Sequence, residues 1–196
     1  MNLVLFDFDG TITNKDTFTK FIVSSASPAR LIVGGIFILP AFILYKLGVL
    51  PASRMRPLVS KVAFAGVCEK HINAKAQGFV CHYLPTVMRK PVLDKIAQHK
   101  EKGDRVIVVS ASLSPYLNIW CQGLGVEVIC SELAVRKGKL TGSYVKGDCS
   151  GIRKVIHIKQ RLNLQHYHNI IAYGDTEEDY PMLNIATTRF YKGKPF

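Results

Sequence analysis

Two carboxylates near the N-terminus, Asp7 and Asp9, have a spacing that suits chemistry on a phosphate group. On a loop that follows a strand, both side chains can point into one site while the intervening Phe8 points away. Side by side, the two carboxylates repel each other and require a cation, and their hard oxygens suit Mg²⁺. Gly10 lets the backbone approach a phosphate, and the amides after it, beginning with Thr11, can donate hydrogen bonds to the phosphate oxygens. A surface Asp-Gly turn is the competing interpretation, but it does not explain the apolar run before the pair.

A second acidic group follows another apolar run near the C-terminus. Asp175 and Asp179 are four residues apart at an expected strand-to-helix junction, where one carboxylate can bind a metal ion while the other orients it. An acidic helix N-terminus, favoured by the helix dipole, is the alternative. That alternative explains the charge but not its position directly behind a buried strand.

Hydroxyl and ammonium groups that can hold a phosphate lie between these two acidic segments. Ser110 and Ala111 follow the apolar run 106–109, and a hydroxyl at a strand end beside a helix N-terminus can bind a phosphate oxygen. By itself, Ser110 is more often the N-cap of the next helix. Lys154, on a helix expected to begin near Gly151, can neutralise a phosphate and hold a carboxylate. Arg153 and Lys159 are alternatives for that role.

The elements that must position these residues alternate between strands and helices. Apolar runs predict strands at 3–6, 105–109, 126–129, 169–173 and 188–191, and helices are expected at 91–102, 114–123 and 151–162. This order predicts an α/β fold with a doubly wound parallel, Rossmann-like sheet, in which ligands bind beyond the carboxyl ends of the strands. Between 133 and 145 the sequence is typical of a β-hairpin turning at Lys137-Gly138.

Residues 14–86 have no strand pattern and are rich in helix-compatible apolar residues. We therefore predict a helical cap at 14–86, inserted after the first strand into a core formed by 1–13 and 87–196. Within it, Leu31 to Tyr45 is 15 residues without a charge, between Arg30 and Lys46. A membrane-spanning helix needs about 20 apolar residues. A buried pair of cap helices, or a segment lying in a membrane interface, is therefore predicted over a true span.

The charge distribution indicates an anionic partner. The net charge is +12, and no acidic residue occurs between Asp16 and Glu69. Such a basic field favours phosphorylated substrates, nucleic acid or acidic lipid surfaces. No nucleic-acid-binding motif and no P-loop sequence occurs, so we expect neither nucleic acid as a partner nor a P-loop enzyme. Five cysteines without a C-x-x-C pair, and an N-terminus without a basic leader, predict reduced thiols in the cytoplasm.

Together and in this order, the four motifs resemble the haloacid dehalogenase superfamily, and most closely its phosphoserine-phosphatase-like branch with an inserted helical cap. The resemblance implies that Asp7 is the nucleophile and that Asp9 is the general acid and then the general base. It implies a phosphate site and a Mg²⁺ site. The phosphate would be held by Gly10, Thr11, Ser110, Ala111 and Lys154; the Mg²⁺ by Asp7, the main-chain carbonyl of Asp9, and Asp175, with Asp179 in support.

The sequence departs from the serine-specific members at Asp16, where those enzymes have a glutamate that contacts the substrate amine, and at Glu178, where asparagine is common. The apolar and basic cap suits an amphipathic anionic substrate, as in bacterial phosphatidylglycerophosphate phosphatases, and predicts peripheral contact with the inner face of an anionic membrane. A phosphatase of a small soluble phosphate, such as phosphoserine or a polyol or sugar phosphate, is the alternative. A non-catalytic basic binding protein is the alternative from another class. The sequence leaves the oligomeric state open.

Overall fold

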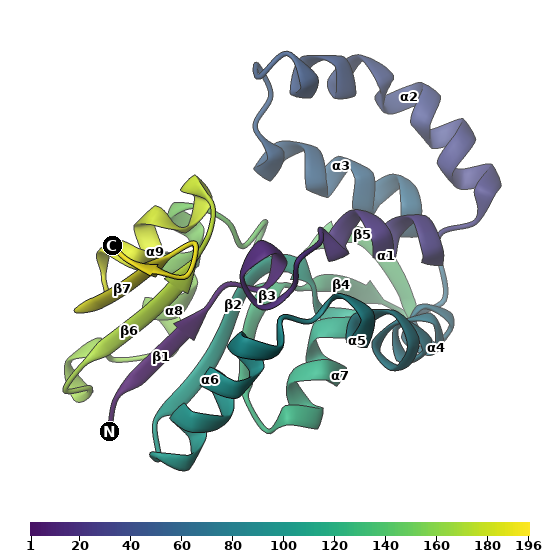
Figure 1. Ribbon diagram of the computed structural model, residues 1–196. Helices are drawn as coiled ribbons and strands as arrows, with labels where there is room; N and C mark the ends of the chain where they lie inside the picture. Colours follow the sequence, from purple (N-terminus) through teal and green to yellow (C-terminus); the bar gives the residue numbers. More distant parts are fainter.

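A computed structural model describes all residues, 1–196, and contains one large sheet surrounded by helices (Figure 1). The strand order is β3-β2-β1-β6-β7-β8. The first five of these pair in parallel, and only β8 is antiparallel to its neighbour β7. Their bounds are β1 Leu3–Phe6, β2 Arg105–Leu113, β3 Glu127–Ser131, β6 Ile170–Gly174, β7 Thr188–Tyr191 and β8 Lys194–Pro195. The predicted α/β class with a parallel sheet is confirmed.

The central strand β1 is buried on both faces, which explains why it is an unbroken apolar run. Its side chains alternate between two cores. Val4 and Phe6 belong to the larger one, beneath α6 (Lys90–Glu101) and α7 (Ser114–Leu124), whereas Leu3 and Leu5 belong to the other, beneath α8 (Ile152–Arg161) and α9 (Tyr180–Asn184). Helices on both faces hold the carboxyl ends of β1, β2 and β6 at one edge of the sheet (Figure 1).

Some predicted boundaries differ from the structure. The strand expected at 105–109 continues through Ser110 to Leu113, and its register with β3 shifts between Ser110 and Leu113. Ser110 is therefore inside a distorted strand end and does not cap α7, which begins at Ser114. The two-residue strand β8 was not predicted because it is too short to carry a pattern. The hairpin of β4 (Leu133–Arg136) and β5 (Lys139–Tyr144) is confirmed, with positive φ angles at Lys137 and Gly138.

The segment between β1 and β2 is helical, and it leaves and rejoins the core at an antiparallel bridge between Thr13 and Met88. Its helices are α1 Thr17–Ser25, α2 Pro28–Lys46, α3 Ala52–Phe64, α4 Glu69–Gly78 and α5 Leu84–Val87, with a π-type turn at Phe79–Tyr83. Main-chain hydrogen bonds join this segment to the hairpin, from Gly66 to Leu140 and from Leu140 to Val67. The hairpin is thus attached to the segment that we predict to be the cap, and the division at 14–86 stays a prediction.

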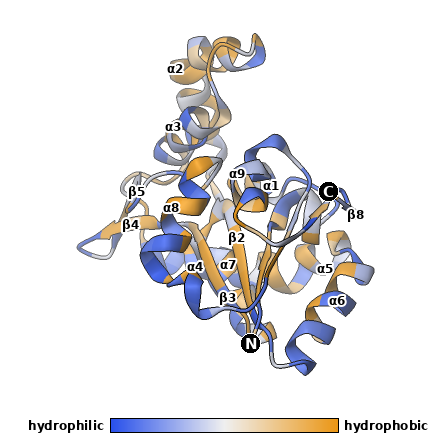
Figure 2. Ribbon diagram, turned by 90° about the vertical axis from the view of Figure 1, so that its left-hand side faces the viewer, coloured by the Kyte–Doolittle hydropathy of each residue, from blue (hydrophilic) through white to orange (hydrophobic).

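Helix α2 stands farthest from the sheet and is predominantly apolar along its length (Figures 1 and 2). It packs along α3, where Gly34 lies directly against Val62, but none of its residues is buried. The expectation of a buried helix pair is therefore wrong, because α3 covers only one side of α2. This helix is long and apolar enough to cross a membrane by length and composition alone.

Candidate active site

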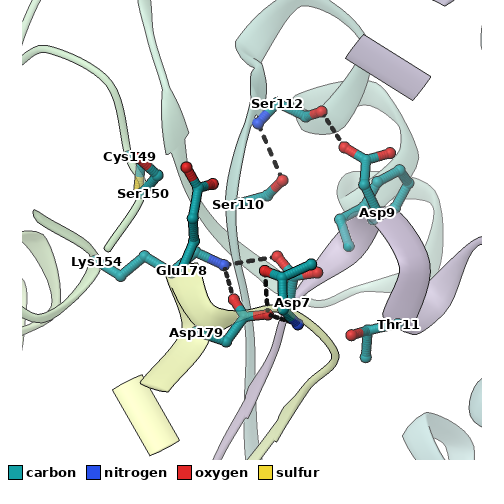
Figure 3. Close-up of polar contacts among 12 residues, drawn as sticks. Asp7, Asp9, Thr11, Ser110, Ser112, Cys149, Ser150, Lys154, Glu178 and Asp179 are labelled. Atoms are coloured by element: carbon teal, nitrogen blue, oxygen red, sulfur yellow. Dashed lines mark hydrogen bonds and ion pairs between the residues drawn. The ribbon is translucent and has the colours of Figure 1, made fainter. Parts of the chain in front are cut away.

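Asp7 lies at the carboxyl end of β1, at the centre of a buried network of charges (Figure 3). Lys154 of α8 donates from Nζ to Asp7 Oδ1 at 2.6 Å and to Asp179 Oδ1 at 2.6 Å. The Lys154 side chain is 2% exposed, so its ammonium is neutralised by carboxylates and not by water. The other oxygen of Asp7, Oδ2, accepts no hydrogen bond from the protein, and Asp7 lines the largest cleft. Asp7 is thus fixed by one oxygen and free to react through the other.

The electrostatics of this network indicate a missing positive charge. Burial raises the pKa of Asp7 well above its usual range; the Lys154 ammonium opposes this, and the negative charges of Asp179 and Asp9 add to it. Burial also raises the pKa of Asp175. By contrast, the pKa of Asp179 is lowered, because the ammonium of Lys154 and hydrogen bonds outweigh the effect of its burial. One lysine therefore does not compensate the three neighbouring aspartates.

The donor set fits a divalent cation with a preference for oxygen ligands. Carboxylate oxygens of Asp7, Asp175 and Asp179 lie within 4.8 Å of one another. Asp179 already binds protein groups with this carboxylate, because its Oδ2 accepts hydrogen bonds from the main-chain amides of Asp175 and Thr176 at 3.0 Å each. Asp7 and Asp175 keep oxygen lone pairs for a metal ion, and burial raises the pKa of both carboxyl groups, so a bound Mg²⁺ would favour their ionised forms.

Gly10 is where the loop after β1 meets the loop after β6. Its φ is +85°, and an added Cβ would lie 2.6 Å from Asp175 Cγ, so a side chain is excluded by both conformation and space. Thr11 next to it donates from Oγ1 to Asp175 Oδ1 at 3.0 Å. The structure therefore gives Thr11 a contact with Asp175 in addition to the phosphate role implied by the resemblance.

Asp9 is held apart from Asp7, on the side nearer the helical segment (Figure 3). Its Oδ1 accepts from the main-chain amide of Thr17 at 2.7 Å and from Thr17 Oγ1 at 2.5 Å, and its Oδ2 accepts from Ser112 Oγ. Thr17 also contacts the hydroxyl of Tyr116 at 2.9 Å. Burial raises the pKa of Asp9, although the hydrogen bonds from Ser112 and Thr17 oppose the change. Asp9 therefore keeps a proton to a higher pH than an exposed aspartate, as a general acid requires.

The residues expected to bind phosphate lie at the distorted end of β2. Ser110 is buried and its Oγ accepts from the main-chain amide of Ser112 at 3.0 Å, while Ala111 lies between them and lines the cleft. The structure thus brings all the predicted site residues to one edge of the sheet. One cleft is lined by Asp7, Asp9, Gly10, Ser110, Ala111, Lys154 and Asp179. Thr11 and Asp175 line a second, smaller pocket, and Gly10 lines both.

The cleft extends from the aspartates to α2 and has a volume of about 830 Å³. Away from the aspartates its walls are mostly apolar and come largely from α1, α2 and α3, including Phe18, Ile22, Leu39, Phe42 and Met55. The cavity therefore has a charged end formed by the core and an apolar end formed by the helical segment. Such a cavity suits a ligand that is polar at one end and apolar at the other.

Arg56 of α3 was missed as a site residue by sequence reasoning, which counted it only as part of the basic field. It lines the cleft and donates from Nη1 to Asp148 Oδ2 at 2.8 Å and from Nη2 to Glu178 Oε2, so it joins α3 to two loops of the core. Thr17 and Ser112, which hold Asp9, were also missed. Their hydroxyls carry no distinctive pattern, and only the fold brings them to Asp9.

Comparisons with known proteins give a matching family profile, a relative by sequence and similar structures. A profile described as haloacid dehalogenase-like hydrolase matches residues 4–184. The Protein CicA of Caulobacter vibrioides is 30% identical over 206 residues, which cover 98% of this chain and 88% of CicA. A Bordetella pertussis protein of unknown function has a similar structure, with a TM-score of 0.77, 20% identity, and coverage of 96% of this chain and 88% of that one. A probable phosphoserine phosphatase from Vibrio cholerae has a TM-score of 0.70 and 17% identity, with coverage of 97% of this chain and 55% of that one.

Proposed function

Because this chain belongs to the haloacid dehalogenase-like hydrolase family, we propose that it is a Mg²⁺-dependent phosphatase, with Asp7 as nucleophile and an amphipathic phosphate ester as substrate. The family expected from the sequence is thereby confirmed. One observation carries the proposal: the buried, lysine-bound Asp7 lies in a cleft whose far end is apolar. A carboxylate attacks phosphorus only when the charge of the phosphate is neutralised, and the site concentrates groups that do this.

In the first step, Asp7 Oδ2 forms a bond to phosphorus while the bond from phosphorus to the ester oxygen breaks. Lys154 holds the other oxygen of Asp7 in place and offsets the negative charge of the phosphoryl group. Ser110, with the amides after Gly10 and at Ala111, binds the phosphoryl oxygens. The departing ester oxygen takes the proton of Asp9, whose raised pKa keeps that proton available.

In the second step, Asp9 accepts a proton from water, and the water oxygen attacks the phosphorus of the aspartyl-phosphate. The bond to Asp7 breaks, orthophosphate leaves and Asp9 is protonated again. Mg²⁺, held by Asp7, Asp175 and the main-chain carbonyl of Asp9, would neutralise phosphoryl charge in this site. Asp179 orients Lys154 through its Oδ1 and the loop that carries Asp175 through its Oδ2.

The apolar end of the cleft favours a lipid phosphate over a small soluble phosphate. Phosphatidylglycerophosphate is the first lipid to test, since the basic, apolar segment resembles that of phosphatases acting on it, and such a substrate would place the enzyme at the inner face of the cell membrane. Phosphoserine is the soluble competitor, because the Vibrio cholerae relative by structure is a probable phosphoserine phosphatase. Against phosphoserine, Asp16 uses its carboxylate as the N-cap of α1, where it accepts from the amide of Thr19 at 3.1 Å.

A phosphatase screen tests both parts of this proposal. Phosphatidylglycerophosphate in detergent, a short-chain analogue, phosphoserine and glycerol phosphate would be compared, each with Mg²⁺ and with EDTA. We expect Mg²⁺-dependent release of phosphate, fastest from the long-chain lipid. Gly35, whose Cα faces open space in the cleft, offers a specific control. Gly35→Leu should slow the long-chain lipid more than glycerol phosphate, because it fills only the apolar end. Full activity in EDTA would refute the metal site, and a preference for phosphoserine would refute the lipid substrate.

A further inference from the structure

The two sides of α2 have different surroundings. Successive residues of an α-helix are about 100° apart, so residues three or four apart share a face. The inner face lines the cleft and consists of Leu31, Gly35, Ile38, Leu39, Phe42 and Tyr45. The residues between these point elsewhere; Val33 lines a shallow pocket with Val62 of α3, and we call Ile32, Ile36, Phe37, Ile43 and Leu44 the outer face. No residue of the outer face lines the cleft, and none is buried.

The outer face is an apolar surface without a partner in the chain. Phe37 is 79% exposed and Ile36 is 67% exposed, and Leu47 and Val49 just after the helix are about as exposed. Isolated apolar residues on a surface are ordinary, but a contiguous set along a helix marks a surface that binds something. An exposed helix of a soluble domain normally carries polar residues on the side away from the core. Helix α2 has none from Leu31 to Leu44.

The charges of the helical segment that carries this surface indicate what binds it. No acidic residue occurs between Asp16 and Glu69, and Lys46, Arg54 and Lys61 are exposed cations without an ion-pair partner. A second copy of the chain that packed its own outer face on this one would bring two basic segments together, and their charges would repel. An anionic bilayer supplies both an apolar layer for the outer face and negative charge for the cations.

The connections of α2 favour a helix lying on the bilayer over one that crosses it. Its 19 residues extend about 28 Å, close to the hydrocarbon thickness of about 30 Å. However, α3 follows after five residues and runs back along α2, carrying Arg54, Arg56 and Lys61. Arg56 is bound to Asp148 and Glu178 of the core. If α2 crossed the bilayer, this charged helix would have to leave either α2 or the core.

We propose that α2 docks its outer face into the surface of an anionic membrane, so that the apolar end of the cleft opens toward the lipid. The inner face then forms a wall that leads from the bilayer to Asp7. The purpose of this orientation rests on the proposed function: it would let a lipid phosphate reach the aspartates without leaving the membrane. The docking itself depends on the outer face and the cations, and not on the aspartates.

Flotation of the full chain with vesicles tests the docking. Phosphatidylcholine vesicles would be compared with vesicles that also contain phosphatidylglycerol. We expect binding to the anionic vesicles, weakened at high salt, and about fivefold weaker for Lys46→Gln. The pair Ile36→Gln and Phe37→Gln should weaken binding at least about tenfold, because two apolar side chains no longer enter the bilayer. Val145→Gln is the matched control: Val145 is 53% exposed on the core and should change nothing.

Activity measurements separate the docking from the chemistry. The Ile36/Phe37 variant should lose hydrolysis of a lipid phosphate in vesicles but keep hydrolysis of soluble p-nitrophenyl phosphate, because neither residue lines the cleft. Asp7→Asn should still float with vesicles but hydrolyse neither the lipid phosphate nor p-nitrophenyl phosphate. If the wild type binds vesicles but hydrolyses neither substrate, only the proposed function is overturned. Docking is overturned if the chain ignores anionic vesicles, if the Ile36/Phe37 variant binds them like the wild type, or if light scattering shows a dimer that this variant separates.

Discussion

Replacing Lys154 with methionine should destabilise the protein in a way that depends on pH. The side chain is 2% exposed and forms ion pairs of 2.6 Å with both Asp7 and Asp179. Methionine has a similar volume, so packing is kept while two carboxylates lose their buried partner. Removing one partner of a buried ion pair typically costs about 3–5 kcal/mol of the free energy of unfolding. That is a large part of the total stability of a domain, which is about 5–15 kcal/mol.

The loss should shrink as the pH falls. Without Lys154, the folded-state pKa of Asp7, already raised by burial, rises further, and the pKa of Asp179, which is lowered in the wild type, also rises above the value of about 3.9 for an unfolded aspartate. A folded-state pKa that is raised favours the folded state at low pH, and this contribution disappears as the pH rises through the raised value. We therefore expect a smaller destabilisation at about pH 5 than at about pH 7.5. Mg²⁺ should stabilise the variant more than the wild type, because the cation replaces part of the missing charge.

Urea unfolding, followed by tryptophan fluorescence, measures this effect. The single tryptophan, Trp120, is 9% exposed and packs edge-on against Phe8, with ring centroids 5.0 Å apart, so it reports on the core beside the site. Lys159→Met on the same helix is the control, because Lys159 is exposed, and it should change stability by less than about 0.5 kcal/mol. If the two variants unfold at the same urea concentration at neutral pH, Lys154 is not the charge that holds this site together.

Four further predictions test Gly10, Asp9 and Asp175. Gly10→Ala should lower activity by more than about tenfold, since it strains the backbone by about 1–2 kcal/mol and displaces Asp175; equal kinetics to the wild type would refute that contact. Asp9→Asn should keep more activity on p-nitrophenyl phosphate than on an alkyl phosphate, because only the alkyl leaving group needs a proton, and equal losses would count against Asp9 as the acid. In the wild type, alkyl phosphate hydrolysis should fall as the pH rises through the raised pKa of Asp9, and a rate that keeps rising would contradict this. Asp175→Asn should raise the Mg²⁺ concentration needed for half-maximal activity, and an unchanged requirement would remove Asp175 from the metal site.

Much of the fold and of the site is readable from the sequence because both depend on short local patterns. The apolar run of β1 predicts a buried parallel strand, and Asp7 follows it directly. Helix α2 shows the limit: its composition predicts an apolar helix equally well whether it is buried or exposed, and only the placement of α3 on one side decides. Pairings between distant residues were also beyond reach. Arg56 and Glu178 are 122 positions apart, and nothing in either local sequence indicates the other.

The central claim is that phosphate is transferred to Asp7. The direct measurement is to mix enzyme with substrate and Mg²⁺, quench in acid within one turnover, and locate the phosphate by peptide mass spectrometry. Asp9→Asn would be used alongside the wild type with p-nitrophenyl phosphate, whose leaving group needs no acid, because the loss of the base should then slow hydrolysis of the intermediate and increase its amount. We predict phosphate on the peptide that contains Asp7, at that residue, and none in Asp7→Asn. Rapid release of orthophosphate with no phosphorylated peptide in either protein, or the same release by Asp7→Asn, would contradict the mechanism.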